Sequence, residues 1–456
     1  MKSTEDCGSR AVLDGLLLAA GVAVLAGMFS VAQPLPHHLQ ISLAVCGLLS
    51  VVAFVATSHI IQGMGETFIK AGLRGIDLNK KTTKREDGVL VRPIEGIPIP
   101  ESQGTVCAVV YILVMSVFIP FAFAYDPDAF PHAKLAEFLA ALLTIALASF
   151  MGFADDVLDL KWRHKIPIPF LCTLPLLLVY RVNGGLTGIM VPHPFRELFG
   201  EYLDLGLFFY LAILIQVVFS THAINIYAGV NGLEAGQSVI MGIAVLIINI
   251  TQLHRIPDGH EAYRERQVQS MFLLAPFLCA SVALFRLNWF PAKVFVGDTY
   301  CYFGGMTLAV VCVVGHANKT LWLLQFPQLL NFVYSLPQLF RFIGIPQPRH
   351  RMPWYDTKTG YVINSYTDPF RREELPGLGR VVFWILRNFR LAHVVPHADG
   401  TFRVSNLTLI NFVMYVCGPS REDVLCCRLL LLQVLSVALC FIVRFGVAGY
   451  LFEEVL

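Results

Sequence analysis

Charged residues are scarce in this chain of 456 residues. Lys, Arg, Asp and Glu make up 14% of it and hydrophobic residues 56%, whereas soluble domains carry roughly 25% charged residues. Such a balance over a whole chain predicts that much of its surface faces lipid. The formal net charge of +2 says little about partners, because the distribution of charge matters more than its sum in membrane proteins. We expect no nucleic-acid partner.

Motifs of several familiar kinds of site are absent. No two of the 11 cysteines have the CxxC spacing, and no Cys/His cluster has the spacing of a zinc site. We therefore expect buried free thiols rather than a disulfide framework. The sequence has no Walker A motif, and its glycines do not form a dinucleotide-binding pattern after a strand. It also lacks an internal repeat at a fixed period.

Long apolar runs dominate the sequence instead. A helix needs about 20 apolar residues to cross a bilayer, and ten runs are candidates: 37–62, 104–124, 135–153, 166–181, 205–222, 236–252, 269–287, 299–315, 320–341 and 427–450. An eleventh run, 12–32, could be a retained span, a surface helix or a signal-like segment. The sequence thus predicts an all-α polytopic membrane protein, a bundle of about ten transmembrane helices.

Ten alternating crossings sort the connecting loops into two sets. One set carries about three times the Lys and Arg of the other, so the positive-inside rule places it in the cytosol. This set consists of 63–103, 154–165, 223–235, 288–298 and 342–426. We therefore divide the chain into an N-terminal extension (1–36), a transmembrane catalytic core of nine spans (37–341), a folded cytosolic insert (342–426) and a last span with the C-terminus (427–456).

Nearly every unusual polar cluster lies in the loops predicted to be cytosolic. Loops far apart in a sequence can converge at one end of a helical bundle, so we expect one catalytic or binding site at the cytosolic surface. The opposite loops contain nothing comparable. The clusters are Asp77-Leu78-Asn79, Glu101, Asp155-Asp156, Asn225, Asn231-Gly232, Gly297-Asp298 and Arg349-His350-Arg351.

The adjacent carboxylates Asp155 and Asp156 end an apolar run. They repel each other, and the C-terminal end of a helix dipole is already negative, so they need a metal ion or the basic residues at 163–165. If the helix continues for one more turn, Asp159 shares a face with Asp155. The alternative is an acidic helix end that the basic residues neutralise at the membrane surface.

Three further features suit a phosphate ligand. Asp298 follows a glycine, which lets a ligand approach the backbone, although a simple helix N-cap is the alternative. Asn225 lies near a membrane boundary and needs a polar partner, whereas Asn231-Gly232 can be a tight turn. The cationic tripeptide 349–351 matches phosphate oxygens, unless it only fixes topology. Together these residues predict a site for a phosphate compound with Mg²⁺, which prefers hard oxygen ligands.

Seven motifs follow one another from about residue 40 to the last span. They are Asp77-Leu-Asn-Lys80, Pro100-Glu-Ser-Gln-Gly104, Gly152-Phe-Ala-Asp-Asp-Val-Leu158 with Trp162-Arg-His-Lys165, Ala223-Ile-Asn-Ile226 with 228–238, Val294-Phe-Val-Gly-Asp-Thr299, Tyr334-Ser-Leu-Pro-Gln338 and Pro348-Arg-His-Arg351. With these motifs the chain resembles the polyprenyl-phosphate hexosamine-1-phosphate transferases, and within them the eukaryotic branch that tunicamycin blocks.

The resemblance implies a reaction and a location. GlcNAc-1-phosphate would be transferred from UDP-GlcNAc to dolichyl phosphate, giving GlcNAc-diphosphodolichol and UMP, the first step of lipid-linked oligosaccharide synthesis for N-glycosylation. The enzyme would use Mg²⁺, lie in the endoplasmic reticulum membrane with its active site facing the cytosol, and form a homodimer.

The resemblance also implies roles for individual residues. The metal ligands would be Asn225 and Asp298, and the catalytic residues Asp155, Asp156 and Lys165. The lipid phosphate would lie beside Val218, Phe219, Ser220, Thr221, His222, Ala223, Ile224, Asn225 and Ile226. Substrate would contact Ile76, Asp77, Leu78, Glu101, Asp159, Trp162, Gly229, Asn231, Phe295, Arg349, His350 and Arg351.

Three positions depart from the family pattern. Ile76 replaces a usual Gln, so only its backbone could contact a nucleotide. Asp159 stands where Asn is usual, and His222 replaces an Asn near the lipid phosphate. None of these changes removes a metal ligand.

The implied mechanism leaves alternatives open. We expect Asp155 to position or deprotonate the attacking dolichyl phosphate, and Lys165, Arg349 and Arg351 to stabilise the spread negative charge. Direct attack is simpler, but sequence leaves a covalent aspartyl-phosphate route open. A related transferase with another polyprenyl phosphate or UDP-sugar is one alternative. A secondary transporter is the other, although transporters place polar residues near the middle of the bilayer.

Overall fold

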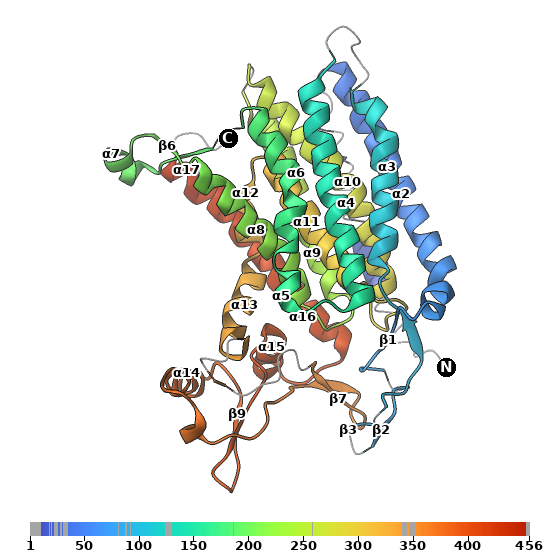
Figure 1. Cartoon of the computed structure of the whole chain (residues 1–456), viewed down its shortest axis with the longest axis vertical. Coiled ribbons are helices and arrows are strands. Elements are labelled where there is room, and N and C mark those ends of the chain that lie inside the picture. The colour runs from blue at the N-terminus through green and yellow to red at the C-terminus, as the bar shows by residue number, and fades with distance from the viewer. Residues whose placement is uncertain are drawn as a thin grey trace.

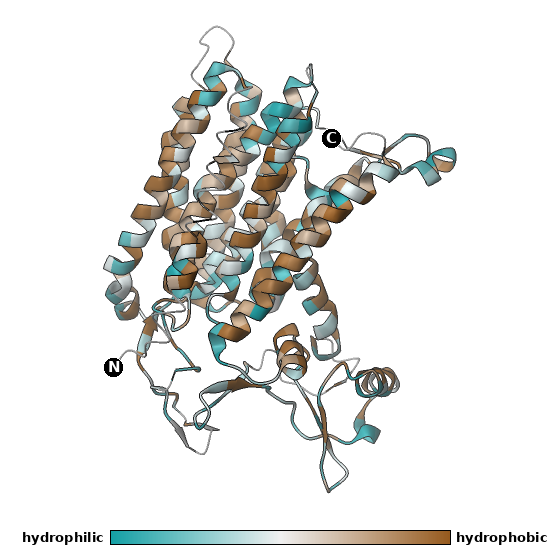
Figure 2. Cartoon of the chain, turned by 180° about the vertical axis from the view of Figure 1, so that it is seen from behind, coloured by the Kyte–Doolittle hydropathy of each residue, from teal (hydrophilic) through white to brown (hydrophobic). Residues whose placement is uncertain are grey.

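The computed structural model describes residues 11–17, 19, 21, 26–27, 30, 35–80, 82–86, 89–91, 93–123, 130–185, 187–257, 259–339, 344–345 and 352–452. The apolar run 12–32 therefore lies mostly outside the described residues. Long helices pack side by side as a bundle, and a smaller part of the chain lies below one end of this bundle (Figure 1). Figure 2 shows apolar residues along the long helices and more polar residues toward their ends.

Within these described ranges, nine helical segments are long and apolar enough to cross a membrane. The all-α polytopic prediction is confirmed. The segments comprise α2 (His37–Lys70), α3 (Gly104–Phe123), α4 (His132–Leu158), α5 (Trp162–Lys165) with α6 (Ile168–Val182), α8 (Leu207–Ile226), α9 (Leu233–Arg255), α10 (Glu261–Asn288), α11 (Gly297–Val314), and α16 (Glu422–Phe441) with η3 (Ile442–Val447) and α17 (Ala448–Leu451).

The apolar run at 320–341 forms two helices rather than one. They are α12 (Asn318–Leu324) and α13 (Phe326–Leu339), and Gln325 separates them. The Gln325 side chain is buried and accepts a hydrogen bond of 3.1 Å from the hydroxyl of Ser220 on α8. Broken helices are tolerated at membrane depth where protein surrounds the break.

Helix α11 runs through the middle of the bundle and is almost entirely buried. Small residues let its neighbours approach closely, as is common between transmembrane helices. A Cβ atom added to Gly152 of α4 would lie 2.7 Å from the Thr299 Cα atom, and one added to Gly305 would lie 2.4 Å from the Ser220 carbonyl oxygen. These contacts fix the start of α11 against the end of α4, and its middle against α8.

Short antiparallel hairpins connect the helices. At the lower end of the bundle in Figure 1, β1 (Arg74–Ile76) pairs with β4 (Pro98–Pro100), and β2 (Arg85–Glu86) with β3 (Val89–Leu90). Strands β5 (Gly188–Met190) and β6 (Tyr202–Asp204) pair with each other in the connection between α6 and α8. The short helices η1 (His193–Phe195) and α7 (Arg196–Phe199) lie between these two strands in the chain.

The chain between α13 and α16 has a small hydrophobic core of its own. It contains β7 (Trp354–Asp356), β8 (Tyr361–Ile363), η2 (Arg372–Glu374), α14 (Gly377–Asn388), β9 (Val394–Pro396), β10 (Phe402–Val404) and α15 (Leu409–Cys417). Phe370, Phe383 and Leu386 lie in the core. The backbone N–H of Leu409 donates a hydrogen bond of 2.8 Å to Asn331 of α13. This part, which we call the insert, is therefore fastened to the bundle.

Candidate active site

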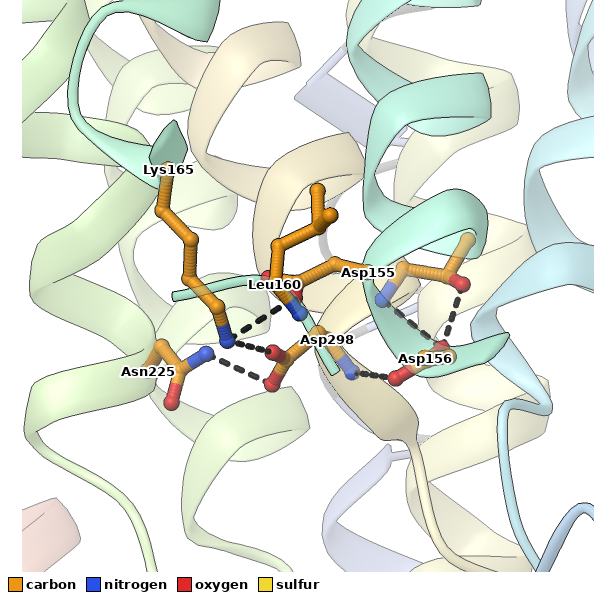
Figure 3. A network of polar contacts seen from close by, with 7 residues as sticks. Asp155, Asp156, Leu160, Lys165, Asn225 and Asp298 are labelled. Carbon is orange, nitrogen blue, oxygen red and sulfur yellow. Dashed lines mark hydrogen bonds and ion pairs between the residues drawn. The ribbon is translucent and has the colours of Figure 1, made fainter. Parts of the chain in front are cut away.

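The ends of α4, α5 and α8 meet the start of α11 in one polar network (Figure 3). The Lys165 ammonium lies 2.9 Å from Asp155 Oδ1 and 3.1 Å from Asp298 Oδ2. Asn225 Nδ2 donates a hydrogen bond of 2.6 Å to Asp298 Oδ1. Residues from three separate parts of the sequence thus form one cluster, as the sequence predicts.

Asp155 is the most deeply buried member of this cluster. Besides Lys165, its Oδ1 atom accepts a hydrogen bond of 3.0 Å from the backbone N–H of Leu160, whereas no described residue bonds its buried Oδ2 atom. A buried carboxylate is costly unless it is paired. Lys165 therefore neutralises Asp155, as expected if the basic residues at 163–165 neutralise an acidic helix end. The same ammonium also reaches Asp298.

Asp156 holds the first turn of α11. Its carboxylate accepts hydrogen bonds from the backbone N–H groups of Asp298 (2.6 Å) and Thr299 (3.1 Å) and from the Thr299 hydroxyl (2.6 Å). These N–H groups have no partner within the helix, and the positive end of the helix dipole favours a carboxylate there. Asp156 thus caps the start of α11, a role that Asp298 was the candidate for. The Asp298 side chain instead faces the network.

Gly297 makes this close junction possible. Its φ of +74° lies in the left-handed region, and a Cβ atom there would lie 2.6 Å from both Asp156 Oδ2 and the Ser102 Cα atom. Only glycine tolerates both conditions without strain. The glycine before Asp298 therefore permits a tight turn between segments of the protein itself.

A cavity of about 300 Å³ lies beside the network. Its walls come from β1 and the residues after it, the α8–α9 turn and the residues before α11. The predicted residues in its lining are Ile76, Asp77, Leu78, Glu101, Asn225, Gly229, Asn231, Phe295 and Asp298. The structure therefore brings together most of the residues assigned to substrate and metal.

Two carboxylates orient the amide of Asn231 in this cavity. Its Nδ2 donates hydrogen bonds to Asp77 Oδ2 (2.9 Å) and Glu422 Oε2 (3.4 Å), and its backbone N–H donates one of 2.9 Å to Glu422 Oε1. An ionised carboxylate only accepts hydrogen bonds. The amide nitrogen is thus fixed toward the carboxylates, and no described residue donates to the amide oxygen. A tight turn at Asn231-Gly232 does not by itself explain these hydrogen bonds of the Asn231 side chain.

Glu101 lies in a negative environment on the same cavity. Burial, followed by repulsion from Asp156 and Asp298, raises the pKa of its carboxyl above the usual value. Nearby, a Cβ atom on Gly75 would lie 2.9 Å from the Phe295 ring and 3.4 Å from Glu101 Oε2. The ring therefore packs directly on the backbone of β1.

A second cavity, of about 420 Å³, shares a wall with the first. Asn225 and Asp298 line both cavities, and Lys165 and His222 line the second. The insert closes it with Met352, Pro353, Thr408 and Ile410. Two adjacent compartments thus meet at the polar network.

The predicted lipid-phosphate stretch reaches this cavity only through His222, Asn225 and Ile226, which lie on one face of α8. A helix turns about 100° per residue, so nine consecutive residues cannot face one ligand. Ser220 and Thr221 bond within α8, while Ala223 and Ile224 are buried. Phe219 stacks on Trp322, 5.2 Å between ring centroids, and Val218 lines neither cavity.

Three other predictions have different outcomes. Asp159 ends α4 with a φ of +47°, is exposed and lines neither cavity. Trp162 belongs to α5, but its side chain lies outside the described part of the structure. Arg349, His350 and Arg351 also lie outside the described residues. The roles assigned to all five of these residues stay predictions.

Several cavity residues escaped the sequence reasoning. Glu234 lines both cavities and accepts a hydrogen bond of 3.1 Å from the Gly229 backbone, and Glu422 begins the last span. An acidic residue at the start of an apolar run could have indicated both positions, because ionisable residues in membrane spans are costly and usually functional. Nothing in the sequence distinguished Met352, Thr408 or Ile410.

Asp298 and Asn225 are the residues that could hold a cation. Across the described ranges, no three His, Cys, Asp or Glu side chains converge as a metal site. Mg²⁺ is commonly held by one or two carboxylates together with substrate phosphates, so a complete protein cage is not required. The Asn225 amide can present oxygen instead of nitrogen by rotation, which makes the pair a suitable hard donor set.

Known proteins are similar to this chain in sequence over most of their length. The family model described as glycosyl transferase family 4 matches residues 138–316. UDP-N-acetylglucosamine–dolichyl-phosphate N-acetylglucosaminephosphotransferase of Schizosaccharomyces pombe is 37% identical over 89% of this chain and 92% of its own. The Saccharomyces cerevisiae protein of the same name is 37% identical, with 88% and 91% covered. The Dictyostelium discoideum protein is 36% identical, with 88% of both chains covered.

Proposed function

The chain belongs to the family of UDP-N-acetylglucosamine–dolichyl-phosphate N-acetylglucosaminephosphotransferases, and on this premise we propose how its site performs the transfer. The enzyme moves GlcNAc-1-phosphate from UDP-GlcNAc to dolichyl phosphate and releases UMP, the first step of lipid-linked oligosaccharide synthesis for N-glycosylation. An oxygen of the lipid phosphate attacks the phosphorus that bears GlcNAc, and the bond from that phosphorus to UMP breaks. One phosphoanhydride replaces another, so the reaction is nearly balanced.

A single observation carries the proposed mechanism: Asn225 and Asp298 line both cavities, and Lys165 reaches Asp298 at their common wall. A transferase must hold a donor and an acceptor on two sides of the reacting phosphorus. The first cavity suits the nucleotide, because it combines the Phe295 ring with the oriented amide of Asn231. The second suits the lipid phosphate, because it lies beside the end of a membrane-spanning helix.

We assign the first cavity to the uridine of UDP-GlcNAc. A uracil ring stacks on the Phe295 ring, as aromatic surfaces allow. The Asn231 amide oxygen accepts a hydrogen bond from the uracil N–H, since the nitrogen is held by Asp77 and Glu422. The pyrophosphate then extends toward Asp298 at the common wall.

Charge at the common wall is balanced by a cation and by Lys165. Mg²⁺ bound by Asn225 and Asp298 with the pyrophosphate would neutralise the charge that develops on UMP as it leaves. The Lys165 ammonium is preorganised by two carboxylates, so it needs little rearrangement to stabilise charge on the transferred phosphate.

The dolichyl phosphate enters the second cavity beside His222, Asn225 and Ile226. Its phosphate oxygen is the nucleophile and is largely ionised near neutral pH, because the second pKa of phosphate esters is about 6. A strong base is therefore unnecessary. Asp155 lines neither cavity, so we assign it the positioning of Lys165 rather than proton removal.

We also propose the cellular setting. The site lies at the end of the bundle to which the Lys- and Arg-rich loops belong, and the positive-inside rule supports a cytosolic position for that end. An endoplasmic reticulum membrane location agrees with the use of dolichyl phosphate.

The test is transfer by purified protein in detergent with UDP-GlcNAc, dolichyl phosphate and Mg²⁺, with and without tunicamycin. We expect UMP release that requires all three components and that tunicamycin stops. Release with a different UDP-sugar but not with UDP-GlcNAc would overturn the substrate assignment. Activity in detergent also excludes a transporter as the source of the signal, since transport requires a sealed membrane.

Asp298→Ala tests the cation assignment in the same assay. We expect loss of nearly all Mg²⁺-dependent transfer. Asp399→Ala is the matched control, because Asp399 is exposed in the insert and lines neither cavity, so transfer should be unchanged. If Asp298→Ala retains full Mg²⁺-dependent transfer, the metal assignment is wrong.

A further inference from the structure

Helix α14 (Gly377–Asn388) in the insert has two apolar faces. Phe383 and Leu386 belong to the small hydrophobic core of the insert, and Gly379 on the same side of the helix is buried. Leu378, Val381 and Trp384 are more than half exposed, at 51%, 53% and 52%, and Ile385 is also exposed. A surface helix of a soluble domain normally has one apolar face and one polar face. The outward face of α14 therefore lacks a partner within the described chain.

The outward apolar residues form one continuous sector. At about 100° per residue, Leu378, Val381, Trp384 and Ile385 span roughly 120° of the helix circumference, on the side opposite the buried residues. The next exposed aromatic residue, Phe389 (66% exposed), contacts Trp384 edge-on, with 6.2 Å between ring centroids. The sector is thus an aromatic and aliphatic surface rather than scattered residues.

Arginines border this apolar sector. Arg380 and Arg387 project from α14 between its apolar sector and its core-facing side, and Arg390 follows the helix. All three are exposed. A helix with an apolar face bordered on one side by arginines, and with tryptophan on that face, has the composition of helices that lie in the interface of a membrane.

The position of α14 agrees with this composition. Figure 1 shows α14 nearly end-on beside the lower part of α13, whereas the spans run up the page. The hydroxyl of Tyr334 on α13 donates a hydrogen bond of 2.6 Å to the Leu391 carbonyl oxygen, just past the end of α14. Val333, next to Tyr334, is exposed and continues an apolar stripe of α13 with Leu330 and Phe326. The end of α14 is thus tied to a helix of the bundle that itself has an exposed apolar stripe.

We propose that α14 lies in the surface of the same bilayer, with Leu378, Val381, Trp384 and Ile385 among the lipid chains and its arginines at anionic headgroups. The axis of α14 crosses the direction of the spans, and the residue just past its end is bonded to α13.

This contact has a consequence for the site. The insert supplies Met352, Pro353, Thr408 and Ile410 to the second cavity, so holding the insert on the membrane holds that wall in place. The inference itself requires only that the chain spans a membrane, and its test does not depend on the transfer reaction.

The test uses the full-length protein in nanodiscs of phosphatidylcholine with some phosphatidylserine, prepared with and without bromine on the lipid chains. The fluorescence of Trp384 is obtained as wild type minus Trp384→Phe. We expect brominated lipid to quench most of this difference signal and aqueous acrylamide to quench little of it. Trp354→Phe gives the matched control, since Trp354 of the same insert lies on β7 and should be insensitive to brominated lipid.

Two outcomes would overturn the proposal. If acrylamide quenches Trp384 fully and brominated lipid does not, the surface faces water. If both quenchers fail, and protection requires two protein molecules in one disc, a second copy covers the surface. Trp384→Phe should retain wild-type transferase activity, which shows that the reference protein is folded.

Discussion

The carboxylate of Asp156, at the end of α4, accepts a hydrogen bond of 2.6 Å from the backbone N–H of Asp298, at the start of α11. One acid thereby orients another that lies 142 residues later in the chain. Asp156 lines neither cavity, so its effect on the reaction passes through the position of Asp298.

Asp156→Asn should therefore lower kcat strongly. The asparagine side chain keeps one acceptor oxygen, so its NH2 group would face the donors of either Asp298 or Thr299, and a shift of about 1 Å at a reacting site can cost roughly 100-fold in rate. We also expect a loss of about 1–3 kcal/mol in stability, since a buried donor loses its acceptor. Kinetics and thermal unfolding in detergent measure both effects. Asp399→Asn is the control, because Asp399 is exposed in the insert and lines neither cavity, and equal losses in the two variants would contradict the assignment.

Asp155 should act only through Lys165. Lys165→Met is expected to reduce transfer by about 10²- to 10³-fold, and Asp155→Asn by less. In a double-mutant cycle, residues that act as a unit are non-additive, so the double variant should be no slower than Lys165→Met alone. Independent, multiplicative losses would instead support a separate role for Asp155, such as proton removal from the lipid phosphate.

Glu422→Gln should weaken nucleotide binding without slowing the chemical step. Glutamine can accept from the Asn231 backbone but presents N–H groups to the Asn231 amide nitrogen, and losing about 1 kcal/mol of hydrogen bonding raises KM by roughly five- to tenfold. The kcat value should change by less than about twofold. Asp423→Asn is the control on the same helical turn, because Asp423 pairs with Arg421 and lines neither cavity. A rise in KM with both variants would point to a general structural effect.

Gly152→Ala should separate α4 from α11. The added methyl group would meet backbone atoms of Thr299 at 2.7 Å, and overpacking of this kind costs about 1–3 kcal/mol. The Lys165 contact to Asp298 should suffer as well, so transfer falls together with thermal stability. Gly63→Ala on α2 is the control, since no atom lies within 4 Å of its added Cβ, and its stability should be unchanged or slightly higher.

Glu101→Gln should reveal a stability cost that depends on pH. The folded-state pKa of Glu101 is raised, so the folded protein binds this proton more tightly than the unfolded protein. The ionised carboxyl thus lowers stability above its raised pKa, and this cost disappears as pH falls toward the unfolded value. We expect the variant to have a slightly higher Tm at pH 8, by no more than about 2 °C, and the same Tm as wild type near pH 4.5. A gain that grows toward acidic pH would contradict this sign.

Much of the fold follows from residue type alone. The apolar runs predict the long helices because a bilayer requires about 20 apolar residues for each crossing. The clustering of Asp155, Asn225 and Asp298 also follows, since polar loops on one side of a bundle must share one surface. The break at Gln325 could not be predicted from residue type. Gln325 lies in an otherwise apolar run, and its buried contact with Ser220 is visible only in the structure.

Within the site, residue types were easier to predict than roles. The acidic pair at 155–156 was evident, but two adjacent carboxylates give no indication that one holds Lys165 and the other caps α11. Of the stretch 218–226, only His222, Asn225 and Ile226 line the second cavity, because the helix presents one face to it. Glu422 was missed since its neighbours in space, Asp77 and Asn231, lie 345 and 191 residues earlier in the chain.

The placement of Glu422 has a consequence for biosynthesis. A ribosome must complete the insert and begin the final hydrophobic segment before Asn231 acquires both of its carboxylate partners. A chain cut short before residue 422 would contain every recognisable motif and still lack one of the two carboxylates that hold the Asn231 amide. If the first cavity binds the nucleotide as proposed, we expect nascent or prematurely terminated copies to bind it poorly, however many of their earlier helices had already been inserted.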